Sequence, residues 1–122
     1  MNHIVVQVTT EYLPRQSEPE KGQYAFTYHI RIENHGDEAA RLLSRHWIIT
    51  DGNSRIKEVS GPGVVGQTPR IEPGEHHQYS SGVVLDTEVG TMEGSYQMIS
   101  DSGETFDATI TPFLLAVPGA VH

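Results

Sequence analysis

Strict alternation of apolar and polar side chains between residues 24 and 33 limits the fold of this chain more than any other feature. Large apolar residues occupy every second position, namely Tyr24, Phe26, Tyr28, Ile30 and Ile32. A mostly polar set lies between them, namely Ala25, Thr27, His29, Arg31 and Glu33. Successive side chains of a strand point to opposite faces of a sheet, so the pattern predicts a strand with one face in a core and one face toward water.

Short β-type segments rich in β-branched and aromatic residues occur along the rest of the chain. We predict further strands over residues 3–13, 42–50, 55–60, 75–84, 95–100 and 104–111. Residues 51–54 form a strong hairpin turn, and residues 86–94 are interpreted as turn-rich. No segment has a helical period over ten or more residues. The sequence therefore predicts an all-β, antiparallel β-sandwich.

Length and cysteine content narrow the class of protein further. The 122 residues fit one domain, residues 1–122. The chain has no cysteine, which excludes disulfides, thiol catalysis and cysteine-bound zinc and suits a cytoplasmic protein. Residues 1–7 lack the features of a signal peptide, and the longest apolar run, residues 113–117, is far too short to span a membrane.

The charge balance argues against two classes of partner. Sixteen acidic and eight basic residues give a formal net charge of −8 with neutral histidines. An acidic surface repels phosphate backbones and anionic lipid headgroups, and no basic stripe is present. We therefore expect no nucleic-acid partner and no membrane partner.

The segment Gly61-Pro-Gly-Val-Val-Gly66 matches the letters of the dinucleotide-binding pattern G-x-G-x-x-G. That pattern works only between a strand and a helix whose N–H groups face a pyrophosphate. Here Pro62 has no N–H, and Pro69 opposes a following helix. We interpret residues 61–74 as an irregular, glycine-rich loop on a rigid scaffold, a common place for binding residues. The candidate binding loop comprises Gly61, Pro62, Gly63, Val64, Val65, Gly66 and Arg70.

The tripeptide Arg45-His46-Trp47 lies in a predicted strand beside that loop. Trp47 is expected to anchor the core, yet Arg45 shares its parity, as does Leu43. The strand must therefore carry a bulge, or one of the two residues, Arg45 or Trp47, must lie near an edge. Arg45 either pairs with an acidic neighbour or presents its guanidinium to an anion. Arg45 and His46 are the candidate residues of the neighbouring surface.

Neither a metal site nor a catalytic site emerges from the sequence. His76 and His77 are adjacent on a strand and point to opposite faces, so they cannot easily chelate one ion. His29 and His46 could meet across a sheet. No serine lies in a Gly-x-Ser-x-Gly elbow, and the paired carboxylates fall at turns. We predict no catalytic residue, no metal ligand and no cofactor.

Five ordered blocks make the chain recognisable: Leu42-Leu-Ser-Arg-His-Trp-Ile-Ile-Thr-Asp51, Val59-Ser-Gly-Pro-Gly-Val-Val-Gly66, Pro73-Gly-Glu75, Tyr79-Ser-Ser-Gly82 and Gly90-Thr-Met-Glu-Gly-Ser-Tyr-Gln-Met98. The chain resembles the bacterial ApaG protein family over nearly its whole length. This resemblance implies a fibronectin type III-like, and so immunoglobulin-like, β-sandwich. It also implies a gene neighbourhood shared with a diadenosine-tetraphosphate hydrolase, links to cobalt and magnesium efflux, and relatives inside eukaryotic F-box proteins that bind proteins.

The expected function is that of a non-enzymatic binding module whose partner is a protein. One alternative is a small-anion or nucleotide-binding protein, with pyrophosphate held by Arg45 or Arg70. A second is an accessory protein of divalent-cation homeostasis, for cobalt or magnesium. A homodimer is also open, because residues 113–117 could cap a sheet edge or pair with a second copy.

Overall fold

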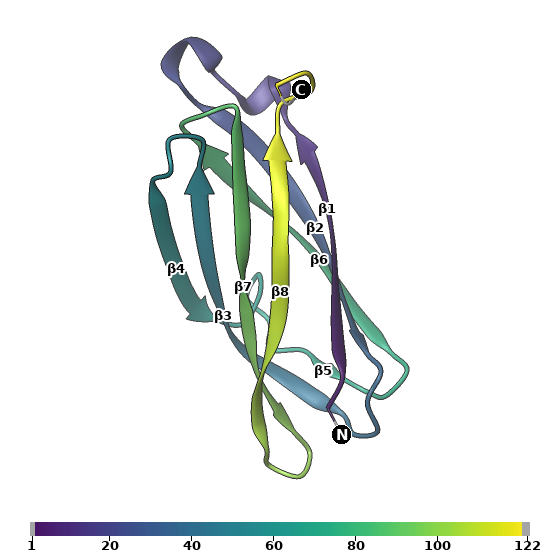
Figure 1. The fold of residues 1–122 in the computed structure, drawn as a ribbon. Coiled ribbons are helices and arrows are strands. Elements are labelled where there is room, and N and C mark those ends of the chain that lie inside the picture. Colours follow the sequence, from purple (N-terminus) through teal and green to yellow (C-terminus); the bar gives the residue numbers. More distant parts are fainter. Residues whose placement is uncertain (1, 121–122) are drawn as a thin grey trace.

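The computed structural model describes residues 2–120 and folds into two antiparallel sheets (Figure 1). The strands are β1 (Ile4–Tyr12), β2 (Tyr24–Asn34), β3 (Ala40–Asp51), β4 (Ile56–Pro62), β5 (Arg70–Ile71), β6 (His76–Leu85), β7 (Val89–Ser100) and β8 (Thr105–Ala116). One sheet has the order β1-β2-β6, and the other has the order β4-β3-β7-β8 with β5 paired to β3. Two 3-10 turns, Pro14–Gln16 and Pro19–Lys21, connect β1 to β2. The predicted all-β antiparallel sandwich is confirmed.

The core lies between the two sheets, and β2 supplies one side of it as its alternation predicted. Phe26, Tyr28, Ile30 and Ile32 are buried, while His29 is exposed on the outer face. The facing sheet contributes mainly Leu42, Trp47, Tyr96, Met98, Ile110 and Leu115. Full burial of each large apolar side chain stabilises the fold by about 1.5–3 kcal/mol, so this shared layer holds the sheets together.

A β-bulge in β3 decides which of its side chains face the core. The register with β7 shifts between Leu42, which pairs with Met98, and Ser44, which pairs with Gln97. Leu42 is fully buried, and Leu43 is 39% exposed. The predicted placement of Leu43 on the Trp47 face is therefore wrong, because the extra residue reverses the alternation at this point. The bulge, one of the two alternatives for this strand, is present between Leu42 and Ser44, and it leaves Arg45 on the same face as Trp47.

Strand β7 begins earlier than predicted. The interpretation of residues 86–94 as turn-rich is wrong from Val89 onward, since β7 runs over Val89–Ser100. Its glycines mark close backbone approach rather than turns. A Cβ at Gly94 would lie 1.9 Å from the carbonyl oxygen of His46. Glycine is therefore needed within the strand itself, where sequence patterns usually indicate a turn.

Strand β8 extends beyond its predicted end. It passes through Pro112 because the register with β7 shifts there: Gly94 pairs with Ile110, and Met92 pairs with Phe113. A proline is tolerated at such an irregularity because no ladder donor is required. The apolar run over residues 113–117 thus pairs mostly within its own sheet, and Leu115 is fully buried.

The two sides of the sandwich are closed differently (Figure 1). On one side β1 lies beside β8, and the Thr10 hydroxyl donates to the Leu114 carbonyl at 3.3 Å. On the other side lie the edge strands β4 and β6, each paired with one neighbour only among the described residues. No helix of residues 2–120 is long and apolar enough to cross a membrane.

Candidate functional site

A groove of 410 Å³ lies between the edge strands β4 and β6. It is lined by Tyr28, Arg45, Trp47, Ile49, Lys57, Val59, Ser81, Gly82, Val83, Val84 and Met92. The lining contains two cations and no carboxylate, although acidic residues outnumber basic ones 16 to 8 in the chain. The groove is therefore locally cationic on an acidic protein.

Aromatic side chains from both sheets form the floor of this groove. The ring centroids of Tyr28 and Trp47 lie 5.5 Å apart at an interplanar angle of 64°. Phe113 packs edge-on against Trp47 with centroids 5.9 Å apart. Edge-to-face pairs of this kind are favourable beyond the area that they bury, so the floor is rigid and apolar. Such a floor suits apolar side chains of a ligand.

Arg45 links the groove to the glycine loop. Its Nη1 donates to the carbonyl oxygens of Pro62 and Gly63, each at 2.9 Å. A Cβ at Gly61 would lie 3.1 Å from Nη2 of Arg45, so the absence of a side chain there makes room for the guanidinium. No carboxylate among residues 2–120 lies within 4.0 Å of this half-buried cation. Arg45 therefore keeps an uncompensated charge and donors that can serve an anion.

The half-buried Tyr79 and the buried Tyr96 lie near Arg45 and do not neutralise it. The hydroxyls of Tyr79 on β6 and Tyr96 on β7 form a hydrogen bond with each other. Burial raises the pKa of both phenols well above the usual range, and the nearby Arg45 charge acts in the opposite direction. Both therefore stay neutral at physiological pH, so the positive charge of Arg45 persists at the groove.

The glycine motif forms a tight two-residue hairpin. Val64 and Gln67 exchange two backbone hydrogen bonds, at 2.8 and 3.0 Å. The central residues Val65 and Gly66 have φ angles of 47° and 76°, as in a type I′ turn. Val64 is buried, and Val65 is 65% exposed. The predicted glycine-rich turn is confirmed at residues 63–67, but the predicted irregular loop over residues 61–74 is too long, because Gly61 and Pro62 belong to β4 and Arg70 belongs to β5. An exposed β-branched residue at positive φ is a strained position that invites a functional explanation.

Of the nine residues predicted for the candidate loop and its neighbouring surface, only Arg45 lines the groove. The guanidinium of Arg70 is bound to Asp101, at 3.3 and 2.5 Å, and to Glu72, at 2.5 Å. It is thus occupied by carboxylates, unlike Arg45. His46 faces the other side of its sheet, with Nε2 4.0 Å from a carboxylate oxygen of Glu58.

The histidines of the described part of the chain do not assemble into a metal site. His29 and His46 lie in different sheets, so the expectation that they could meet across a sheet is wrong. His29 instead contacts Ser80, with 2.6 Å between Nδ1 and Oγ, as a cross-strand polar pair on an outer face. Within residues 2–120, no group of three or more His, Asp or Glu side chains could hold a metal ion.

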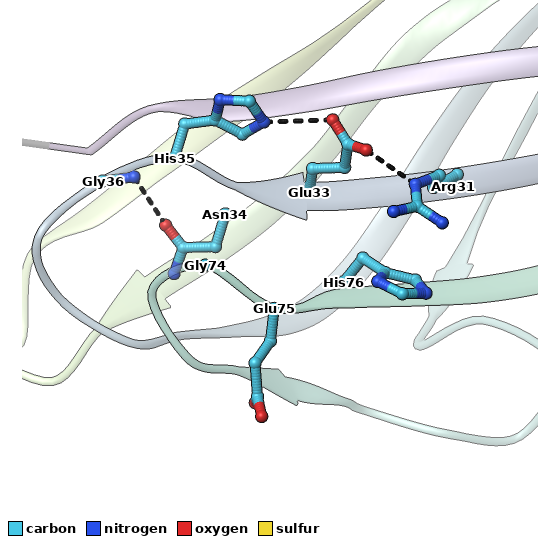
Figure 2. Close-up of a pocket in the computed structure, with 8 residues that line it drawn as sticks. All are labelled: Arg31, Glu33, Asn34, His35, Gly36, Gly74, Glu75 and His76. Atoms are coloured by element: carbon cyan, nitrogen blue, oxygen red, sulfur yellow. Dashed lines mark hydrogen bonds and ion pairs between the residues drawn. The ribbon is translucent and has the colours of Figure 1, made fainter.

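A second hollow, of 350 Å³, lies where β2 ends and β6 begins (Figure 2). Three of its side chains, Arg31, Glu33 and His35, interact with one another. The Glu33 carboxylate accepts from Arg31 Nε at 2.6 Å and lies 3.0 Å from His35 Nε2, and these two hydrogen bonds lower the pKa of Glu33. The buried Asn34 amide donates to the carbonyls of Glu38 and Ile71. We infer that this cluster holds the end of β2 and the start of β6 together.

The fold and the groove define the class of protein: an antiparallel β-sandwich whose two free edge strands border a cationic groove with an aromatic floor. The ApaG domain family model matches residues 14–100, and the chain belongs to the ApaG family. Protein ApaG of Ectopseudomonas mendocina (strain ymp) is 61% identical over 119 residues, which cover 98% of this chain and 94% of that protein. Protein ApaG of Azotobacter vinelandii is 56% identical over the same shares of the two chains.

Solved structures agree with this assignment. The Northeast Structural Genomics Consortium target SoR45 superposes with a TM-score of 0.92 at 55% identity, covering 98% of this chain and 90% of that one. The putative ApaA protein from Bordetella pertussis gives a TM-score of 0.94 at 48% identity, covering 97% of this chain and 96% of that one. The predicted family is thereby confirmed.

Proposed function

We propose that this chain is a non-enzymatic binding module that holds a protein partner in the groove between β4 and β6. The observation that carries the proposal is the groove itself: an aromatic floor between two free edge strands, with the uncompensated Arg45 at its wall. Aromatic and arginine side chains are the residue types that most often dominate binding energy at protein interfaces. A cysteine-free chain also suits a reducing compartment, so we place the module in the cytoplasm.

The extent of the groove favours a polypeptide over a small molecule. A neighbouring hollow of 190 Å³ shares Ile49, Lys57 and Val84 with it and continues along the same two strands. Ile56 and Val84 border this continuation and are 67% and 61% exposed. Contiguous exposed apolar side chains with a charged rim are typical of protein-binding surfaces.

The strained tip of the glycine loop adds a contact point at the β4 end of the surface. Val65 is exposed at positive φ, a conformation that costs of order 1–3 kcal/mol for such a residue. Arg45 holds the loop through the Pro62 and Gly63 carbonyls, so the tip has a defined position relative to the groove. We therefore include Val65 in the proposed binding surface.

Anion binding is the second candidate function, and the charge of Arg45 and Lys57 in the groove favours it. Calorimetry with ATP and with inorganic pyrophosphate tests it directly. Heat at millimolar ligand that is lost in an Arg45→Lys variant would support this candidate. For the divalent-cation alternative, the described residues offer no supporting cluster.

A photo-crosslinking amino acid placed at Val84 tests the proposed function in bacterial cells that produce the full chain. The matched control position is Leu114, which is 48% exposed on β8, near β1 and away from the groove. We expect discrete adducts with other proteins from position 84 and few from position 114. Identical adduct patterns from the two positions, or none from either, would contradict a partner in the groove.

A further inference from the structure

Strand β6 is an edge strand without the usual protection against pairing. Across His76–Leu85 it has no lysine, arginine, aspartate, glutamate or proline. It pairs only with β2 among the described strands. Natural edge strands normally carry such residues, a bulge or a cover, because an unprotected edge is a template for another strand. A ten-residue edge of this kind therefore points to a strand as its ligand.

The register shows which backbone groups of β6 are free for pairing. The Asn34 N–H donates to the Glu75 carbonyl at 3.0 Å, at the start of the β2–β6 ladder. Hydrogen-bonded pairs recur at every second residue of an antiparallel ladder, so Tyr79, Ser81 and Val83 direct their backbone groups toward β2. The N–H and C=O groups that point away from β2 are those of Gln78, Ser80, Gly82 and Val84.

The groove beside this edge sets the side chains that a partner strand should carry. Every second side chain of an added strand would face the core side of the sheet, above the rings of Tyr28 and Trp47. Apolar side chains fit that floor. Arg45 and Lys57 stand on the facing sheet with no carboxylate in the lining. Arg45 lies opposite Gly61 and Lys57 lies opposite Ile49, four residues farther along the ladder, so an acidic side chain is complementary to each of them at a separate place.

We infer that the partner is an extended segment of another protein that adds as a strand to the edge of β6. Its inward positions alternate apolar side chains with a carboxylate that meets Lys57, and Arg45 is a separate place for a second one. This inference rests on the proposed function and specifies its mode. Backbone hydrogen bonds to the edge supply affinity, and the groove supplies specificity, as in other cases of strand addition.

A second copy of this chain fits the same edge less well. Pairing of β6 with another β6 would bring no carboxylate to Arg45 and Lys57, because β6 contains none. It would also bring together two molecules that each carry a formal charge of −8. Charge complementarity therefore favours a different, acidic partner segment.

The test begins with selection of random peptides of about nine residues, one strand length, from a display library on the full chain. We expect the selected peptides to share alternating apolar residues and one aspartate or glutamate. Their affinity is then measured by calorimetry on Ser80→Pro and on its control Ser80→Ala. Both variants lose the Ser80 hydroxyl, but only the proline variant loses the N–H that faces away from β2.

We expect Ser80→Pro to weaken peptide binding about three- to tenfold relative to Ser80→Ala, the effect of one hydrogen bond. Circular dichroism checks that both variants fold. If Ser80→Pro does not fold, the comparison of Gln78→Pro with Gln78→Ala replaces it. A Lys57→Glu variant should select peptides with a basic residue in place of the acidic one. Equal affinity for the proline and alanine variants overturns strand addition, and unchanged peptide charge with Lys57→Glu overturns the carboxylate assignment.

The outcomes also separate this inference from the proposed function. One outcome is that the peptides compete with the crosslinks at Val84 and yet bind the proline and alanine variants with equal affinity. That result would keep the groove as the binding site and overturn only strand addition to β6. A Ser80→Pro variant that turns a dimer into a monomer, with no acidic peptide selected, shows that a second copy occupies β6 and overturns the inference.

Discussion

The two edge strands that border the groove differ in almost every property that governs pairing. Strand β4 has Lys57 on its inward face, ends in Gly61 and Pro62, and continues into a strained type I′ turn. Strand β6 is longer and has no such feature over its ten residues. Inward charges and prolines on an edge discourage pairing with another chain. The difference indicates that β4 is protected and serves as a wall, whereas β6 is left open for a strand.

The same comparison explains why the conspicuous glycine motif and the binding edge lie in different strands. Gly61 makes room for the Arg45 guanidinium. Gly63 allows the loop to turn back tightly, because a Cβ at this position would lie only 2.4 Å from the Gln67 carbonyl oxygen. The motif thus shapes the cationic wall of the groove. The strand that receives the partner has no conspicuous motif, because pairing uses backbone groups.

The largest expected effect separates the two faces of the β6 backbone. Ser81→Pro removes an N–H that belongs to the ladder with Tyr28, whereas Ser80→Pro removes one that faces away from it. We expect Ser81→Pro to lower the free energy of unfolding by about 2 kcal/mol or more, because a buried ladder acceptor is left unpaired. Ser80→Pro should cost less than about 1 kcal/mol. Urea denaturation measures both, and equal losses would show that the register argument is wrong.

The next effect concerns the end of β4. Gly63→Ala places a Cβ 2.4 Å from the Gln67 carbonyl oxygen at a φ of 61°, while Gly66→Ala has a φ of 76° and open space around it. We expect a loss of about 2 kcal/mol for Gly63→Ala and about 1 kcal/mol for Gly66→Ala, because the first adds a clash to the backbone strain. Thermal or urea unfolding compares them. A larger loss at Gly66 would contradict the described loop.

Val65 offers a test in which stability and binding change in opposite directions. Val65→Asn replaces a β-branched residue at a φ of 47° with one suited to type I′ turns. We expect the free energy of unfolding to rise by about 0.5–1 kcal/mol, because the strain is relieved. Crosslinking yield at Val84 should fall if the apolar tip contacts the partner. A stabilised variant with full crosslinking would confine the partner to the groove.

A smaller effect tests the protection of β4. Lys57→Val removes the inward charge from the β4 edge, and Glu58→Gln changes only the outward side. We expect Lys57→Val to self-associate at high concentration, because the edge then resembles β6, with monomer stability changed by no more than about 0.5 kcal/mol. Light scattering across a concentration series detects it. A Lys57→Val variant that stays as monomeric as Glu58→Gln would remove the contrast between the two edges.

The smallest effect is a pH dependence at the start of β6. Burial lowers the pKa of His77 below its usual value of 6.5, and the neighbouring His76 adds to this shift. The unfolded chain therefore binds the proton more readily, so this contribution to stability is present above pH 6.5 and declines as the pH falls. We expect His77→Gln to flatten the urea midpoint between about pH 7 and pH 5. A parallel decline in both proteins would assign the effect to another group.

Local pattern accounted for much of the fold. The alternation in β2 and the turn at residues 51–54 were sufficient to place a half-buried strand and a hairpin. The wrong predictions lie where a single residue interrupts the alternation of side chains along a strand. The bulge after Leu42 moves Leu43 to the outside, and Gly94, which the sequence predicts in a turn, lies under the His46 carbonyl. Such close approaches depend on the neighbouring strand and leave no local signal.

The site was less predictable, because its residues come together only in three dimensions. Arg45 and Arg70 were equivalent as candidate anion partners in the sequence. The structure distinguishes them through Asp101, which is 31 residues from Arg70 and binds its guanidinium. The groove joins β2, β3, β4, β6 and β7, and its cationic character depends on which carboxylates are absent from its lining. The one available sequence signal was the lack of charge along β6.

Hydrogen–deuterium exchange of the β6 amides tests the central claim most directly, with the free chain compared with its complex with a selected acidic peptide. We predict that the amides of Tyr79, Ser81 and Val83 are protected in both states. The amides of Gln78, Ser80, Gly82 and Val84 should exchange rapidly in the free chain and become protected in the complex. Outward amides that are already protected in the monomer, or new protection confined to β4, would contradict an open β6 edge.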